Sequence, residues 1–272
     1  MSYCHLAGAG TYGNCTVPTP NPGINLAAGF GTKPGNTIRT GLTNAINGNV
    51  IDGTCSCSAT CLEDYVTNIY GSNWSTESPR FTGDVDGDGK DDVVGCASAG
   101  LRVSLSTGTD IVYDNAWNIA QFGYSHGWRS TLHPRHVVDL NGDGKNDFVG
   151  FANEGVRVSL STGTTFQSHV TWTTGYGVDN GWTVADHPRI FGDFNNDGLN
   201  DFVACANALT MVEESTGTSF VRNTAFNLAH FFFNQGWTAQ TPRMVGDVDG
   251  DGFDDDFVGF GPNQVQVAKS DG

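Results

Sequence analysis

Asp84-Val85-Asp86-Gly87-Asp88-Gly89 is the stretch that decides the fold, because its pattern returns three more times along the chain. The other copies begin at Asp139, Asp193 and Asp247, so the first aspartates are 55, 54 and 54 residues apart. Self-similarity at a fixed period near fifty residues is the signature of a repeat architecture. The sequence therefore predicts at least four copies of one structural unit.

Each unit runs through the same order of segments from about residue 62 onward. An aromatic-Gly-Trp turn leads to a Pro-Arg pair, a short strand, the Asp loop, an apolar strand, an alternating strand, a Ser-Thr-Gly-Thr turn and a last strand. Val156-Arg157-Val158-Ser159-Leu160 shows the period-two alternation of a strand with one buried face. Four strands per unit are typical of a β-propeller blade.

We therefore predict an all-β fold, a β-propeller of four-stranded blades. An irregular, cysteine-containing segment, residues 1–61, precedes it. The propeller itself takes residues 62–272, with repeats at about 62–118, 119–173, 174–227 and 228–272.

Two units depart from the pattern. Thr210-Met211-Val212-Glu213-Glu214 breaks the alternation, so the third blade is expected to be degenerate or differently packed. The fourth unit carries one extra residue near Asp254-Asp255-Asp256, which predicts a bulge there and leaves its ninth-position ligand open. The chain also stops before a fourth strand of that unit.

The repeated loops have the composition of calcium sites. Carboxylate or amide side chains stand at positions 1, 3, 5 and 9, and the carbonyl at position 7 offers one more oxygen. Ca²⁺ prefers six to eight oxygen ligands, and a glycine at position 6 permits the sharp bend of the loop. An EF-hand is excluded because it needs glutamate at position 12, where these loops have Gly95, Gly150, Ala204 and Val258.

About four structural Ca²⁺ ions are therefore predicted, whose binding energy would stabilise the fold. The predicted ligands are Asp84, Asp86, Asp88, Lys90, Asp92, Asp139, Asn141, Asp143, Lys145, Asp147, Asp193, Asn195, Asp197, Leu199, Asp201, Asp247, Asp249, Asp251, Phe253 and Asp255.

The net charge of −16 argues against nucleic acid and anionic membranes as partners. Of the 29 acidic residues, 14 lie in the four loops, so the acidity is mainly a metal-site signature. No run of eighteen or more apolar residues exists, so no membrane span is predicted.

The seven cysteines fall into two groups. Cys96 and Cys205 occupy one repeat position, and we interpret them as small buried hydrophobes. The other five cysteines lie in the N-terminal segment. We expect them to form disulfides rather than a zinc site, because the usual spacing between zinc ligands is missing. These residues are Cys4, Cys15, Cys55, Cys57 and Cys61.

Calcium loops and clustered cysteines both indicate an extracellular protein. The N-terminus shows no secretory signal, so either a signal has been removed or the chain starts inside a larger protein.

The repeats resemble the FG-GAP/VCBS-type propeller repeats of integrin-like and extracellular microbial proteins, and more closely the Psathyrella velutina lectin family. The likeness covers residues 62–272 and rests on stretches such as Gly127-Trp128, His133-Pro134-Arg135, Asp139 to Gly144 and Phe148-Val149-Gly150-Phe151. It implies seven-bladed propellers with calcium in the blades. It also implies pockets between blades for N-acetylglucosamine-type or sialylated glycans. This chain departs from that family in having four recognisable units.

Sugar sites combine an aromatic face with a few fixed polar groups. The recurring candidates are Tyr124, Trp128, His133, Arg135, Tyr176, Trp182, His187, Arg189 and Trp237. Only the second and third units have the full set, which favours two intact sites. The alternative is that the tryptophans pack blade against blade and that the Pro-Arg pairs, present in all four units, belong to the scaffold.

We therefore predict an extracellular, calcium-stabilised lectin whose partners are glycans or glycoproteins. It would be non-catalytic, because no nucleophile elbow, P-loop or zincin motif occurs and the loop aspartates are committed to calcium. The alternative is an extracellular structural or adhesion protein with an integrin-like propeller, alone or within a larger assembly. Phe231-Phe232-Phe233 would support that alternative if exposed; by default it is expected in a strand or the core.

Overall fold

The computed structural model describes residues 11–12, 15–16 and 75–270. The chain divides into two units, Met1–Val66 and Thr67–Gly272. In the first unit the described residues form a short antiparallel pair, β1 (Thr11–Tyr12) and β2 (Cys15–Thr16). The predicted irregular segment and its disulfides otherwise lie outside the described residues.

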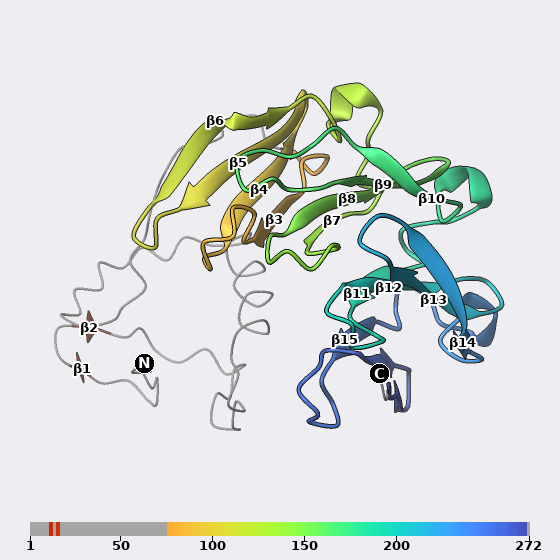
Figure 1. Cartoon of the computed structure of the whole chain (residues 1–272). Coiled ribbons are helices and arrows are strands. Elements are labelled where there is room, and N and C mark those ends of the chain that lie inside the picture. Colours follow the sequence, from red (N-terminus) through yellow and green to blue (C-terminus); the bar gives the residue numbers. More distant parts are fainter. Residues whose placement is uncertain (1–10, 13–14, 17–74, 271–272) are drawn as a thin grey trace. The chain divides into compact units, whose positions relative to one another are not determined.

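The second unit contains four antiparallel sheets, each built from consecutive strands (Figure 1). The first sheet has β3 (Arg80–Gly83), β4 (Asp92–Ala97), β5 (Gly100–Ser106) and β6 (Ile111–Ile119). The second has β7 (Arg135–Val138), β8 (Asp147–Phe151), β9 (Gly155–Ser159) and β10 (Val170–Thr174). The third has β11 (Arg189–Gly192), β12 (Asp201–Cys205), β13 (Thr210–Ser215) and β14 (Phe220–Leu228). The fourth has β15 (Arg243–Gly246), β16 (Asp256–Phe260) and β17 (Val265–Ala268).

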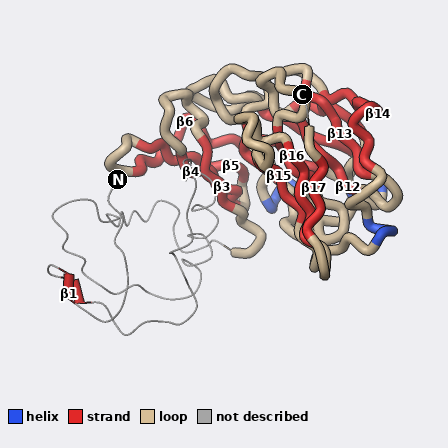
Figure 2. The backbone as a smooth tube through the Cα atoms, turned by 90° about the horizontal axis from the view of Figure 1, so that it is seen from below, coloured by secondary structure: helices blue, strands red, loops and turns tan. Residues whose placement is uncertain are grey.

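The four sheets follow one another in chain order, as a propeller requires (Figure 1). Figure 2 shows β15, β16 and β17 side by side in the fourth sheet. First strands of neighbouring sheets meet where β3 contacts β7 and β11 contacts β15. The predicted all-β fold is thereby confirmed, and the row of sheets is consistent with a propeller, although the sheets of residues 75–270 do not close into a ring. The fourth sheet has three strands within the described residues.

Each apolar cluster of the core includes side chains from two successive sheets. Val94 and Leu101 of the first sheet pack with Phe148 of the second, for example. The second and third sheets share a cluster that includes Val149 and Phe202. Cys96 and Cys205 are buried and unpaired in these interiors, which confirms their interpretation as small hydrophobes.

The third sheet is differently packed but not degenerate, because β13 pairs with both of its neighbours. Glu213, which stands at the position of Ser159 in the second sheet, is buried. Its carboxylate accepts hydrogen bonds from the Tyr176 hydroxyl and from Arg222 Nε (2.8 Å for the latter). Polar partners supplied by a neighbouring turn and strand thus compensate for burying a charge.

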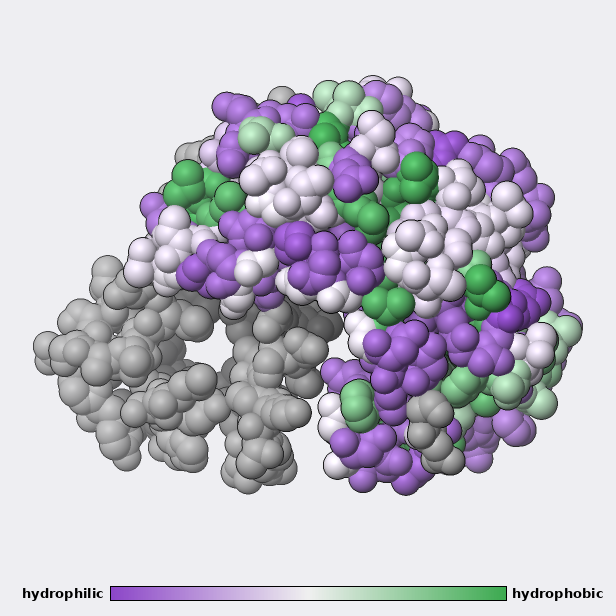
Figure 3. Space-filling view, viewed as in Figure 1, coloured by the Kyte–Doolittle hydropathy of each residue, from purple (hydrophilic) through white to green (hydrophobic). Residues whose placement is uncertain are grey.

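Three short 3₁₀ helices lie in the turns that lead into the second, third and fourth sheets. They are η1 (Tyr124–His126), η2 (Val178–Asn180) and η3 (Phe233–Gln235). Phe231 is buried in the core at a positive φ of 65°, within the expectation of a strand or the core, whereas Phe232 and Phe233 lie partly buried in the turn. None of the helices among the described residues is long or apolar enough to cross a membrane. On the face of the second unit seen in Figure 3, polar residues surround small, separate apolar groups.

Candidate ligand pocket and metal loops

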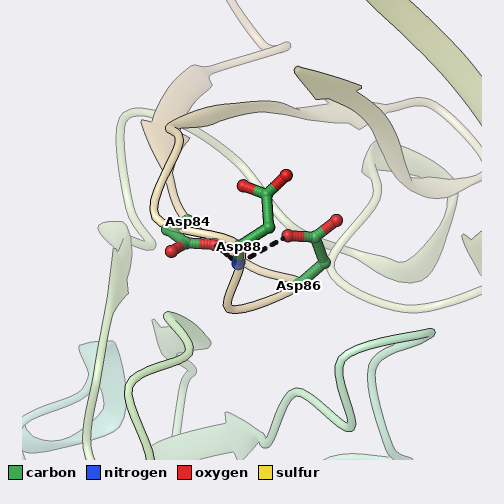
Figure 4. A group of neighbouring side chains, drawn as sticks. All are labelled: Asp84, Asp86 and Asp88. Atoms are coloured by element: carbon green, nitrogen blue, oxygen red, sulfur yellow. Dashed lines mark hydrogen bonds between the residues drawn. The ribbon is translucent and has the colours of Figure 1, made fainter. Parts of the chain in front are cut away.

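The first Asp loop gathers three carboxylates around one point (Figure 4). Oxygens of Asp84, Asp86 and Asp88 lie within 4.8 Å of one another. The loop is held in shape by its own amides, since Gly87 N and Gly89 N each donate to the Asp84 carboxylate at 2.7 Å. An all-oxygen, anionic donor set of this kind fits a hard cation such as Ca²⁺.

In the first three loops the ninth-position aspartates accept hydrogen bonds from backbone amides. Asp92 is buried, and its two oxygens accept hydrogen bonds from Val85 N (3.0 Å) and Ser106 N (2.8 Å). Asp147 and Asp201 make the same pair of bonds in the second and third loops. Burial raises the pKa of both to about 7. Each of these side chains ties its Asp loop to the end of the third strand.

The fourth loop uses Asp256, not the predicted Asp255, in this position. The Asp256 carboxylate is buried and accepts hydrogen bonds from Val248 N (2.8 Å) and Ser270 N (3.2 Å). It also lies within 4.8 Å of oxygens of Asp247 and Asp249. The cause is the extra residue of this loop, which moves the following strand by one position.

Residues of the second and third loops are brought together in a related way, with asparagine at position 3. Asn141 Nδ2 donates to Asp143 Oδ2 at 3.3 Å, and Asn141 Oδ1 accepts from Asp143 N at 3.1 Å. The side chain of Lys145, predicted to contribute only its carbonyl, forms an ion pair with Asp143 at 2.9 Å. Lys90 forms the same pair with Asp88 in the first loop.

The predicted ligand-binding histidines are buried and fully engaged. His133 Nδ1 accepts a hydrogen bond from Arg129 N at 3.0 Å, so Nε2 carries the proton and donates to Asn153 Oδ1 at 2.7 Å. Burial lowers the pKa of His133. His187 repeats the arrangement in the third unit, where Nε2 lies 2.9 Å from Asn207 Oδ1.

The predicted tryptophans and arginines also make scaffold contacts. The Trp128 ring lies so close over Gly150 that an added Cβ would stand 2.6 Å from it. Arg135 Nη1 donates to the Phe122 carbonyl at 3.1 Å and so ties the turn to β7. In the third unit Trp182 is half-buried, and the buried Arg189 guanidinium lies 5.5 Å from its ring.

The two predicted tyrosines lie in different surroundings. Tyr124 is exposed, with the Arg129 guanidinium 3.6 Å from its ring centroid. Tyr176 is buried, and its hydroxyl is bonded to Glu213. Tyr124 is therefore the one exposed residue among the predicted aromatic side chains.

A pocket of about 380 Å³ opens beside Trp237 in the fourth unit. It lies between the turn around η3 and the β16–β17 hairpin. Thr241 and Pro262 stand here where the second unit has His133 and Asn153, and the smaller pair leaves the space open. The lining residues are His230, Gln235, Gly236, Trp237, Thr241, Gly261, Pro262, Gln264 and Gln266.

The sequence pattern predicts Trp237 but not the other residues that line the pocket, because the prediction required units with the complete set of aromatic and histidine residues. The signal that could have found them is the loss of the bulky histidine at Thr241.

Residues 139–204 match the FG-GAP-like repeat. The FG-GAP-like repeat thus begins with the second Asp loop and ends in β12, one loop later. No curated protein matches the chain.

Among solved structures, the chain is similar to a lectin from Agrocybe aegerita, described for its specific recognition of non-reducing terminal N-acetylglucosamine. The two are 33% identical with a TM-score of 0.68, over 73% of this chain and 50% of the lectin. The chain therefore spans half the length of that lectin. Together with the FG-GAP-like repeat, this match confirms the resemblance to the Psathyrella velutina lectin family.

Proposed function

We propose that this chain is a non-catalytic, extracellular carbohydrate-binding module that recognises glycans ending in N-acetylglucosamine. The observation that carries the proposal is the similarity to the Agrocybe aegerita lectin, at 33% identity over 73% of this chain. The pocket beside Trp237 is the site we assign to the sugar.

The chemistry of the pocket suits a neutral amino sugar. Trp237 offers an indole edge, and Gln235, Gln264 and Gln266 offer amide groups that both donate and accept hydrogen bonds. An acetamido group needs all three features of this pocket: a hydrogen-bond acceptor for its N–H, a donor for its carbonyl and an apolar wall for its methyl group. No lysine or arginine lines the pocket, so nothing there would balance the carboxylate of a sialic acid.

Calcium belongs to the proposal as a structural ion. The gathered oxygens of Asp84, Asp86 and Asp88 would hold one ion, and those of Asp247, Asp249 and Asp256 another. The ions would neutralise carboxylates that otherwise repel and so would stabilise the loops that connect the first two strands of each sheet.

The test is a glycan array of the purified chain in millimolar calcium, repeated with a double variant, Thr241→His with Pro262→Asn. The double substitution recreates the His133–Asn153 pair of the second unit and fills the pocket. We expect the parent chain to bind glycans ending in N-acetylglucosamine and the double variant to lose that binding at an unchanged Tm. Thr241→Ser, which keeps the pocket open, is the matched control.

Two outcomes would contradict the proposal. A blank array from folded, calcium-loaded protein would refute sugar binding. Equal binding by the parent and the double variant would place the sugar elsewhere, with the exposed Tyr124 as the next candidate.

A further inference from the structure

Buried hydrogen bonds connect the four Asp loops to one another. At each joint between successive sheets, a serine at or just after the end of the third strand donates its hydroxyl to the preceding Asp loop. The acceptor is the backbone carbonyl at position 2 of that loop. The three bonds are Ser161 Oγ to Val85 O (2.5 Å), Ser215 Oγ to Leu140 O (2.7 Å) and Ser270 Oγ to Phe194 O (2.7 Å).

The same serines also hold the Asp loop of their own sheet. The N–H of each serine donates to one oxygen of a buried aspartate, at 2.7 to 3.2 Å; the aspartates are Asp147, Asp201 and Asp256. The other oxygen of each aspartate accepts the N–H at position 2 of the loop in that sheet, at 2.8 to 3.1 Å; these donors are Leu140, Phe194 and Val248. One serine and one aspartate therefore lie between each pair of neighbouring loops.

Together these bonds form one continuous path, which we call the serine–aspartate relay. None of its three serines and three aspartates is more than 7% exposed, so water competes little for these bonds. The residue at position 2 stands between the predicted calcium ligands at positions 1 and 3, so the relay meets each loop beside its ligands. In order, the relay runs through Val85, Ser161, Asp147, Leu140, Ser215, Asp201, Phe194, Ser270, Asp256 and Val248.

A second contact joins the first three loops directly. Position 8 of one loop donates to the backbone carbonyl of the first predicted ligand of the loop before it. The two bonds are Asn146 N to Asp84 O (2.6 Å) and Asn200 Nδ2 to Asp139 O (2.8 Å). At position 8 of the fourth loop, the Asp254 carboxylate instead accepts from Asp247 N of its own loop at 3.1 Å.

We propose that the Asp loops bind calcium cooperatively and that the serine–aspartate relay carries the coupling from each loop to the next. This inference rests on the structural calcium ions of the proposed function. Gathering the ligands at positions 1 and 3 around an ion fixes the peptide at position 2 between them. An ion at one loop therefore orders the serine and aspartate shared with the neighbouring loop, and the next ion has less left to order.

The charges of the loops allow this coupling to be favourable. The three carboxylates gathered in the first loop, those of Asp84, Asp86 and Asp88, exceed the charge of one Ca²⁺. A filled loop consequently presents no net positive charge that would repel the next ion. By thermodynamic linkage each loop then raises the calcium affinity of its neighbour by the same factor that it receives.

The experiment is a calcium titration of the full chain after chelation, followed by isothermal calorimetry. The parent is expected to bind calcium with a Hill coefficient above about 1.5. Ser215→Ala interrupts the relay between the second and third loops. It should lower the Hill coefficient and weaken the mean affinity roughly fivefold, as expected for one hydrogen bond. Ser219→Ala is the matched control, because it removes a hydroxyl that contacts Thr216 Oγ1 (2.9 Å) outside the relay, and it should titrate like the parent.

A double-mutant cycle distinguishes coupling from a purely structural role of Ser215. Asp197→Asn removes a carboxylate of the third loop that is not part of the relay. With the relay intact, this change should weaken calcium binding at the remaining loops several-fold, and in the Ser215→Ala background the effect should be smaller. A purely structural serine would lower the Tm in chelator but leave the effect of Asp197→Asn on the other loops unchanged.

The outcomes separate this inference from the proposed function. Calcium binding by the parent with a Hill coefficient of 1 or less would overturn the coupling and leave the structural calcium ions standing. Cooperative binding that Ser215→Ala leaves unchanged would overturn the relay as its carrier. A chain that binds no calcium would overturn both the coupling and the structural ions, whereas the glycan array would still decide sugar binding.

Discussion

At the scale of single residues, the identities that repeat in the sequence serve mainly to hold the sheets together. Trp128 packs over Gly150, Arg135 binds the Phe122 carbonyl, and His133 is bonded at both ring nitrogens. The sequence showed that these residues recur, but it could not show that their rings pack against the rest of the protein. The pocket lies instead in the fourth unit, where Thr241 replaces the recurring histidine.

His136 gives the molecule a pH dependence that can be tested. The ring packs against Phe191 (5.1 Å between centroids), and its buried Nε2 has no hydrogen-bond partner. Burial lowers the pKa of His136 to about 4, so between pH 6.5 and 4 the unfolded chain binds a proton that the folded chain does not. Stability contributed by this residue is present at pH 7 and is lost as the pH falls.

The expected loss between pH 7 and pH 5 is about 2 kcal/mol from this group alone. Urea unfolding of His136→Leu at the two pH values should show a drop smaller than the parent's by that amount. An identical drop in both proteins would show that other groups set the pH dependence.

At the scale of the elements, the period, the order of segments and the apolar strands were sufficient to predict the four sheets from sequence. Oxygens of Asp84, Asp86 and Asp88 also lie close together, as the spacing suggests, while the calcium ion itself stays a prediction. The ninth position was harder, because the pattern cannot distinguish a carboxylate that faces an ion from one that accepts backbone amides behind the loop. In the fourth loop the insertion also concealed which of two neighbouring aspartates takes that place.

The fourth loop therefore separates two neighbouring carboxylates by role. Asp256 accepts backbone amides of the loop and of Ser270, whereas the buried Asp255 carboxylate has no hydrogen-bond partner. Asp256→Asn should destabilise the protein by about 1–3 kcal/mol, because it replaces an acceptor oxygen with a donor facing amides. Asp255→Asn should be neutral or stabilising, because it removes an uncompensated charge. The free energy of unfolding of both variants, measured by chemical denaturation in the presence of a chelator, tests this. If Asp255→Asn were the more destabilising of the two, the roles given to Asp255 and Asp256 would be wrong.

At the scale of the whole molecule, the proposed calcium ions would make the stability of the fold depend on the calcium concentration. Ligand that binds only the folded state stabilises it in proportion to the logarithm of its concentration. Removing calcium with a chelator should lower the Tm, and returning calcium should restore it, with a smaller effect from magnesium. The measurement is calorimetry of the same sample before and after chelation. An unchanged Tm in chelator would remove calcium from the proposed function.

The two ends of the row of sheets were the part of the fold that the sequence could not predict. A repeat pattern specifies each sheet and its neighbour, but the number of sheets that complete a ring depends on the angle set at each joint. That angle comes from side-chain volumes such as those of Phe151 and Phe202, which periodicity does not encode.

Each sheet is made from one uninterrupted stretch of chain, and this has a consequence for how such a molecule can change over generations. A duplication or deletion of one repeat-length segment of the coding sequence adds or removes a complete sheet without rethreading any strand. The serine and the loop carbonyl that join neighbours would be copied with it, so the new junction would already carry its matching groups. The number of sheets in such a chain is therefore open to change by a single genetic event, whereas the layout within a sheet is not.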